Sequence, residues 1–169
     1  MTNTRTLVMN PKQVTQRINR LAWQVYEQCY DEKEIVVAGI SGNGLHLAKR
    51  ITKIIEEISP IKIELCEVNL NKENPLDGSG NIKIDSQKLE GKTVVLVDDV
   101  SNSGRTLMYG VKLFLESPVR SIKTLVLVDR DHNRFPVKTN FVGLSLATTM
   151  QEHISVEVGS NGEDTVYLD

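Results

Sequence analysis

The chain has 169 residues, of which 40% are hydrophobic and 25% are charged, so its composition is globular and excludes disorder, collagen and coiled coil. The net charge of −2 gives no overall basic field that would draw the protein onto nucleic acid or an anionic membrane. No apolar run approaches the roughly 20 residues of a membrane-spanning helix, and the first residues lack the apolar stretch of a signal peptide. Cys29 and Cys66 match no metal-binding or redox spacing, so we expect reduced core thiols in a cytoplasmic protein.

The N-terminal part of the chain predicts a helix, a buried strand and a second helix. Asn10 is a suitable N-cap for a helix that ends near Cys29, because apolar residues recur every three or four positions between them. The nearly continuous apolar run over residues 34–40 predicts a strand that is covered on both faces. Apolar residues at helical spacing then predict a second amphipathic helix from Ala48 to Ile58.

The rest of the chain continues this alternation. Residues 70–81 are polar and rich in glycine and proline, and a loop of this length is more often a mobile functional segment than a plain linker. Strands are predicted over residues 61–65, 93–97 and 124–129, a helix over residues 105–115, and short β-like pieces around residues 141, 154–158 and 165–168.

This order of elements predicts an α/β fold, with a mainly parallel sheet flanked by helices, in a single domain over residues 1–169. In such sheets, ligands bind at the carboxyl ends of the strands. We therefore expect the polar segments that follow the buried strands to form one ligand-binding edge.

The most informative segment is VVLVDDVSNSGRT, residues 94–106. Asp98 and Asp99 end a buried strand, where two neighbouring carboxylates are costly unless they bind a ligand. A ribose diol suits them, because two vicinal hydroxyls can donate to the paired carboxylates. The small residues that follow precede a helix N-terminus, whose amides and dipole suit a phosphate. Together these features predict a ribose 5-phosphate site.

Three other functions are compatible with parts of these segments. A strand ending in two aspartates is also typical of the magnesium site of nucleotide-hydrolysing domains, but their GxxxxGK[ST] loop is absent. A phospho-acceptor pocket would leave the residues after Asp99 unexplained. The segment VVAGISGNG (36–44) has some features of a dinucleotide-binding turn, with Glu64 or Glu67 as the ribose acid, but Asp98–Thr106 would then have no purpose.

Residues 94–106 resemble the phosphoribosyl pyrophosphate signature of type I phosphoribosyltransferases. The wider pattern resembles the bifunctional pyrimidine operon attenuation protein/uracil phosphoribosyltransferases over residues 10–169, chiefly in residues 36–51, 91–107 and 125–143. The resemblance implies a parallel sheet flanked by helices, with a small hood that covers the nucleobase. It also implies an enzyme that joins a nucleobase, most simply uracil, to phosphoribosyl pyrophosphate and releases pyrophosphate.

By this resemblance, each segment of the site has an expected role. Asp98 and Asp99 would bind the ribose hydroxyls, and Lys72, in the flexible loop over residues 70–81, would act in catalysis. The 5-phosphate would be bound by Ser101, Asn102, Ser103, Gly104, Arg105 and Thr106. The pyrophosphate loop would consist of Ile40, Ser41, Gly42, Asn43 and Gly44. The base pocket would include Asp129, Arg130, Phe141 and Val142.

The resemblance implies Mg²⁺ as a cofactor, held mainly by the substrate. This chain departs from the family's pattern at the positions where the family has lysine and arginine side chains. The family's pyrophosphate loop usually contains a lysine and an arginine, and Ser41 and Asn43 stand in their places. These side chains offer dipoles where negative charge develops in the transition state. We therefore expect ordinary affinity for phosphoribosyl pyrophosphate but slow turnover.

A second class of function is a regulator that binds the nucleotide or phosphoribosyl pyrophosphate and contacts RNA or a protein partner. In the family, RNA contact uses a basic surface that includes the first helix, where this chain has Lys12, Arg17 and Arg20. The acidic overall balance argues against strong binding of an RNA backbone. We also expect a homo-oligomer with no membrane association.

Overall fold

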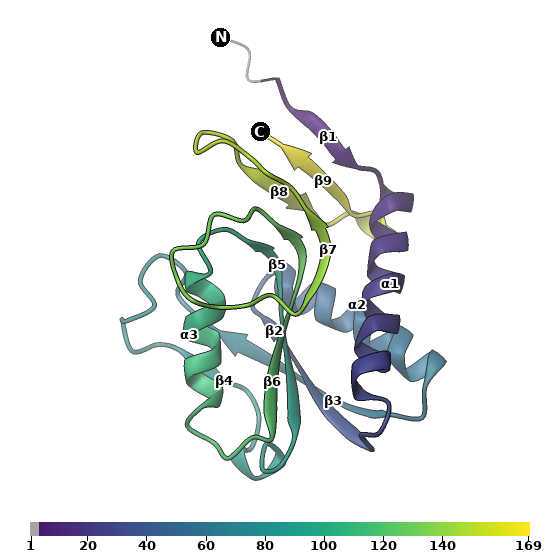
Figure 1. The fold of residues 1–169 in the computed structure, drawn as a ribbon, viewed down its shortest axis with the longest axis vertical. Helices are drawn as coiled ribbons and strands as arrows, with labels where there is room; N and C mark the ends of the chain where they lie inside the picture. The colour runs from purple at the N-terminus through teal and green to yellow at the C-terminus, as the bar shows by residue number, and fades with distance from the viewer. Residues whose placement is uncertain (1–3) are drawn as a thin grey trace.

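Figure 1 shows the computed structural model, which describes residues 4–169, with a central sheet between helices and a smaller sheet above it. The central sheet has the strand order β4-β3-β2-β5-β6-β7, and only β4 runs antiparallel to its neighbour. Its strands are β2 (Glu34–Ile40), β3 (Lys62–Asn69), β4 (Asn81–Ile82), β5 (Thr93–Ser101), β6 (Ser121–Asp129) and β7 (Phe141–Ser145). The predicted α/β fold with a mainly parallel sheet is confirmed.

Two helices cover one face of the sheet and one helix covers the other (Figure 1). They are α1 (Pro11–Cys29) and α2 (Asn43–Ile58) on the first face and α3 (Arg105–Phe114) on the second. Short 3-10 turns occur at η1 (Ser86–Lys88) and η2 (Ser160–Gly162). None of the helices within residues 4–169 combines the length and the apolar character needed to cross a lipid bilayer.

The predicted cap of α1 is present as a reciprocal pair of hydrogen bonds. The Asn10 side chain accepts from the backbone N–H of Gln13, and the Asn10 backbone N–H donates to the Gln13 side chain, both over 2.9 Å. These bonds satisfy two polar groups that a helix start otherwise leaves unpaired. In contrast, α2 starts at Asn43, five residues before the predicted start at Ala48. The sequence did not reveal this earlier start because the first turn contains a glycine and lacks a side-chain cap.

The core is built from strands whose two faces are both buried. Along β5, Val95 and Val97 pack towards α1 and α2, whereas Val94 and Leu96 pack towards α3. A parallel strand covered by helices on both faces needs apolar residues at nearly every position, which explains the continuous apolar runs in the sequence. The two cysteines are free and buried as expected, and burial raises the pKa of the Cys66 thiol to about 12.

The smaller sheet, here called the hood, consists of β1 (Thr6–Met9), β8 (Ile154–Glu157) and β9 (Thr165–Leu168). Its order is β1-β9-β8 and all its pairs are antiparallel. Figure 1 places it above the carboxyl ends of the central strands, where β1 and β9, from opposite ends of the described chain, lie side by side. The hood therefore lies over the edge at which a parallel sheet binds its ligands.

Candidate active site

A cavity of about 730 Å³ opens at the carboxyl end of β5, beneath the hood. It draws on four separate parts of the chain: the loop after β3, the end of β5 with the start of α3, the segment after β6, and β8. Its lining residues are Lys72, Asp98, Asp99, Val100, Ser101, Asn102, Ser103, Gly104, Arg105, Thr106, Leu107, Arg134, Phe135 and Ile154. The cavity thus brings together the predicted carboxylates, the predicted phosphate loop and Lys72.

Asp98 is almost completely buried at the end of β5, with 1% of its surface exposed. Burial, together with the neighbouring charge of Asp99, raises the pKa of its carboxyl to about 7. The ammonium of Lys72, with Nζ 3.2 Å from Oδ1 of Asp98, opposes this shift because it stabilises the charged form. Such a buried carboxylate has capacity to accept further hydrogen bonds from a ligand.

Asp99 is half-buried beside Asp98, and its two oxygens are already oriented by the protein. Oδ1 accepts from the backbone N–H of Val100 over 2.8 Å, and Oδ2 accepts from Nδ2 of Asn43 over 3.0 Å. A carboxylate offers about four acceptor positions, so Asp99 keeps capacity for a ligand hydroxyl. The two aspartates together form an acceptor pair suited to a vicinal diol.

The phosphate-loop segment, residues 101–106, turns from β5 directly into α3. Gly104 has φ of +82°, and a Cβ on it would lie 2.7 Å from Cγ1 of Val137, so both the backbone angle and the space require glycine. The segment and the first turn of α3 line the cavity, where the free amides of a helix start favour an anion. The hydroxyl of Ser101 is buried and has no hydrogen-bond partner within residues 4–169.

Arg130 stabilises the phosphate-loop segment through hydrogen bonds from outside the cavity. Its backbone N–H donates to the carbonyl oxygen of Ser101 over 3.0 Å, and its side chain donates to Oδ1 of Asn102 over 2.8 Å. The same buried guanidinium donates to Oγ1 of Thr148 and to the carbonyl oxygens of Thr149 and Glu152. These contacts engage the guanidinium outside the lining of the cavity, and the predicted contact of Arg130 with the base stays a prediction.

The other three residues predicted for the base pocket also lie outside the cavity. Asp129 accepts from Oγ1 of Thr139 and from the backbone N–H of Asp131, so it stabilises the turn after β6. Phe141 is buried in the core on the α1 face, at the first position of β7, and Val142 follows it. The carboxyl end of β7 is Ser145, and the predicted contacts of these three residues with the base stay a prediction.

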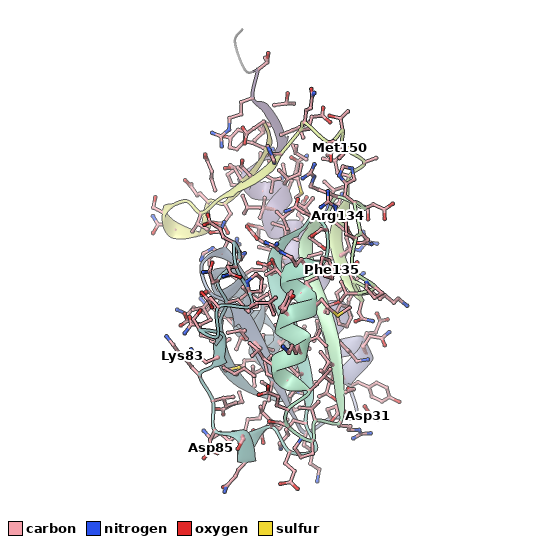
Figure 2. The ribbon with its side chains drawn as sticks, turned by 90° about the vertical axis from the view of Figure 1, so that its left-hand side faces the viewer. Asp31, Lys83, Asp85, Arg134, Phe135 and Met150 are labelled. Atoms are coloured by element: carbon pink, nitrogen blue, oxygen red, sulfur yellow. The ribbon has the colours of Figure 1, made fainter. Side chains whose placement is uncertain are left out.

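Three residues that were not predicted line the cavity on the side next to the segment after β6 and the hood. Arg134 and Phe135 follow β6, and Figure 2 shows them beside the start of α3. The Phe135 ring lies 6.5 Å from the ring of Tyr109, and Ile154 enters the cavity from β8. Sequence reasoning missed all three, since backbone hydrogen bonds to the carbonyl oxygen of Ser103 place Arg134 and Phe135, and the hood places Ile154.

The predicted pyrophosphate loop runs from β2 into α2 beside the cavity. The backbone N–H of Ser41 donates to the carbonyl oxygen of Val68 over 2.9 Å, and Gly42 has φ of +90°. Neither Ser41 nor Gly42 lines the cavity, and the loop meets the carboxylate pair through Asn43. The loop supplies no cation here, in agreement with its sequence.

No group of three or more histidine, cysteine, aspartate or glutamate side chains within residues 4–169 is arranged to hold a metal ion. Asp98 and Asp99 are the carboxylates that line the cavity. A pair of carboxylates fits a Mg²⁺ ion that arrives with substrate phosphates rather than one held by the protein alone.

Comparison with known proteins identifies the family. The model of the phosphoribosyl transferase domain matches residues 8–160. This chain is a type I phosphoribosyltransferase. A bifunctional protein PyrR from Synechocystis is 32% identical, with 95% of this chain and 94% of the relative covered. The PyrR protein of Clostridium novyi is 28% identical, with 97% of each chain covered.

Solved phosphoribosyltransferase structures have the same fold. The hypoxanthine phosphoribosyltransferase of Trypanosoma cruzi superposes with a TM-score of 0.74 at 14% identity, covering 96% of this chain and 95% of the other. A hypoxanthine-guanine phosphoribosyltransferase from Bacillus anthracis gives 0.69 at 19% identity, covering 83% and 82%. The resemblance noted in the sequence is confirmed, and the phosphoribosyltransferase is a pentosyltransferase close to the PyrR proteins.

Proposed function

We propose that this phosphoribosyltransferase joins uracil to phosphoribosyl pyrophosphate, giving uridine monophosphate and pyrophosphate. The observation that carries the proposal is the carboxylate pair of buried Asp98 and half-buried Asp99 directly before the phosphate loop, in one cavity. Uracil is the proposed base because the chain resembles the bifunctional pyrimidine operon attenuation protein/uracil phosphoribosyltransferases and matches PyrR proteins over nearly its full length. The neighbouring structures are named for hypoxanthine, so hypoxanthine is the alternative base to test.

In the proposed site, Asp98 and Asp99 accept from the ribose hydroxyls, and residues 101–106 bind the 5-phosphate. The base stacks on the side of the cavity formed by Phe135 and Ile154, with the charge of Arg134 at its rim. Positioning of the two reactants in line supplies much of the rate enhancement, since the reaction requires no protein nucleophile.

Attack of a base nitrogen on the anomeric carbon breaks the bond to pyrophosphate and leaves negative charge on the departing oxygens. Asp98 and Asp99 would help to hold a Mg²⁺ ion that arrives with the substrate, and this ion would supply positive charge as the pyrophosphate leaves. Lys72 is the cation within the cavity that reaches the carboxylate pair, and it is available to the leaving group once the ribose occupies Asp98. With Ser41 and Asn43 in place of cations, we expect slow turnover.

The direct test is a panel of nucleobases, each mixed with phosphoribosyl pyrophosphate and Mg²⁺ and scored for release of pyrophosphate. We expect uracil to react and the purine bases to give at most background. Conversion of hypoxanthine in preference to uracil would reverse the base assignment. If none of the bases in the panel leads to release of pyrophosphate, the proposed transfer is contradicted.

The site itself is tested by Asp99→Asn, which weakens a charge-assisted hydrogen bond worth about 1.5–3 kcal/mol. We expect the affinity for ribose 5-phosphate, measured by calorimetry, to fall about ten- to a hundredfold. Asp31→Asn is the matched control, because Asp31 is exposed and Figure 2 shows it at the opposite end of the molecule. Equal affinity in both variants would refute the ribose assignment.

A second candidate function, binding of RNA, is favoured by two adjoining hollows between α1 and β7, here together called the groove, which share Gln24 and Val142. Arg17 and Arg20 line the first hollow, and Lys123 and Lys138 line the second. We infer that this groove binds an RNA backbone weakly, since Arg17 already donates to the carbonyl oxygen of Gly143 over 2.9 Å. Retention of RNA should fall steeply as salt rises, and salt-independent retention would exclude a phosphate-directed contact.

A further inference from the structure

Asn43 lies where α2, the end of β5 and the hood meet. It is the first residue of α2, and the preceding Gly42 turns the chain into the helix. The next residue, Gly44, packs so closely on β5 that a Cβ there would lie 2.8 Å from the carbonyl oxygen of Val97 and 3.1 Å from Oδ1 of Asp98. This close packing holds the Asn43 side chain beside the carboxylate pair.

One nitrogen of Asn43 makes two hydrogen bonds. Its Nδ2 donates to Oδ2 of Asp99 and to the carbonyl oxygen of Val156, each over 3.0 Å. A side-chain amide nitrogen carries two hydrogens, so both are used in these bonds. The remaining amide oxygen is an acceptor and does not bind a phosphate oxygen. The side chain therefore has no donor left for a pyrophosphate.

The two acceptors belong to different halves of the proposed site. Asp99 is a proposed acceptor for the ribose hydroxyls, whereas Val156 lies in β8, two residues after Ile154. Ile154 lines the cavity on the side where the base is proposed to bind. Because β8 is an outer strand of the hood sheet, its free edge presents the carbonyl oxygen that Asn43 contacts. Asn43 thus connects the ribose side of the cavity to its base side.

We propose that Asn43 is a positioning residue that couples occupation of the ribose site to the position of the hood, and that it is not a ligand of the pyrophosphate. The inference rests on the proposed function, because Asp99 is taken there as a ribose acceptor. Ribose hydroxyls that donate to Asp99 fix its carboxylate, and Asn43 carries this restraint to β8 and Ile154. Binding of the sugar phosphate thereby orders the wall against which the base binds, which is a coupling between two sites.

A second attachment keeps the hood in place when Asn43 is replaced. Oδ2 of the buried Asp164 accepts from Nη1 of Arg50 over 2.9 Å and lies 2.8 Å from Nε2 of His46. Both partners are on α2, the helix that Asn43 begins. A variant at Asn43 therefore removes the coupling while the hood remains attached and folded.

The test compares amide hydrogen exchange in the unmodified protein, in Asn43→Ala and in Asn43→Leu, which is close in size and has neither a donor nor a charge. Each is measured alone, with ribose 5-phosphate and with phosphoribosyl pyrophosphate. In the unmodified protein we expect both ligands to slow exchange over residues 98–106 and over residues 154–158. In both variants the first effect remains, and the second falls by about three- to tenfold, the equivalent of one net hydrogen bond.

Lys49→Ala is the control, since Lys49 is exposed on the same helix, and it should keep both effects. In steady-state assays, the two Asn43 variants should raise the KM for the base by about three- to tenfold, with a smaller change in the KM for phosphoribosyl pyrophosphate. A purely structural defect would raise both values together or reduce the amount of folded protein.

Two results would overturn the inference. The first is protection over residues 154–158 that is equal in the variants and in the unmodified protein. The second is loss of affinity for phosphoribosyl pyrophosphate with unchanged affinity for ribose 5-phosphate, because Asn43 would then act on the pyrophosphate. If neither ligand slows exchange over residues 98–106 in the unmodified protein, the proposed ribose site itself is refuted, and the coupling with it.

Discussion

Asp98 combines a role in binding with a cost in stability. Its carboxyl is 1% exposed and has Asp99 beside it, and these two features raise its pKa to about 7. In an unfolded chain an aspartate has a pKa of about 3.9. The folded protein therefore disfavours the charged form of this side chain, as expected where a ligand supplies the missing hydrogen bonds.

This pKa difference predicts how stability depends on pH. Between about pH 4 and 7, the folded state keeps a proton on Asp98 that the unfolded state has released, so stability falls as the pH rises through this range. Asp98→Asn removes the charge, and we expect it to raise the free energy of unfolding by up to about 4 kcal/mol at pH 8. At pH 4 the variant should be close to the unmodified protein.

Urea denaturation at pH 4, 6 and 8 measures this difference. The gain from Asp98→Asn should grow with each step in pH and then level off above the folded-state pKa of about 7. Asp31→Asn, at an exposed position, should show no such trend. A gain that is constant across the range would mean that Asp98 is charged in the folded protein at every pH tested.

At the scale of elements, the loop between β3 and β4 is attached to the site at one end only. Lys72 pairs with Asp98, and the side chain of Arg105 donates to the carbonyl oxygen of Lys72. Further along, the loop is held by local bonds, such as that from Asn71 to Asp77 over 2.7 Å. The residues near its tip are exposed, including Leu76. This arrangement suits a segment that rearranges when a substrate displaces Lys72 from Asp98.

We therefore expect residues 70–81 to be mobile without ligand and to close over the filled site. Phosphoribosyl pyrophosphate should slow tryptic cleavage after Lys72 several-fold. Cleavage after Lys33, in the exposed connection between α1 and β2, should keep its rate and serves as the internal reference. An unchanged rate after Lys72 at saturating ligand would count against a lid.

Elements with a local pattern of apolar or capping residues could be predicted from the sequence. Elements that depend on a partner far away in the chain could not. The buried strands follow from continuous apolar runs, and α1 follows from Asn10 and its apolar period. Four-residue β1 has no such pattern, since its partner Leu168 lies at the other end of the chain. Likewise, Ile154 is one apolar residue among many until the hood brings it to the cavity.

At the scale of the whole molecule, the hood is attached to the central domain through α2. Asp164 is 3% exposed, and its Oδ2 forms hydrogen bonds with the side chains of both His46 and Arg50. Its Oδ1 accepts from the backbone N–H of Gly159. A buried carboxylate with several donors stabilises a fold mainly because removing it leaves those donors unpaired. Asp164, in the turn before β9, thus adds a polar attachment of the hood to the bond from Asn43 and to the packing of Met9 and Val166 in the core.

Asp164→Ala should therefore lower the free energy of unfolding by about 1.5–3 kcal/mol and expose the hood to proteases. Thermal unfolding measures the first effect, and the rate of proteolysis within residues 154–169 measures the second. Glu163→Ala is the matched control, because Glu163 is the exposed acidic neighbour. Equal melting temperatures for the two variants would show that the ion pairs to α2 contribute little.

A ribosome releases β1 before every other strand, yet β1 gains its hydrogen-bond partner only after β9 has emerged, because Thr6 pairs with Leu168. The central sheet needs no residue beyond Ser145, so its strands and the carboxylate pair can assemble while the hood is still missing. On the proposed assignments, the sugar-phosphate site is built at the edge of the central sheet, whereas the base wall needs strands from both ends of the chain. Half of the active site therefore depends on the pairing that joins the most distant parts of the sequence.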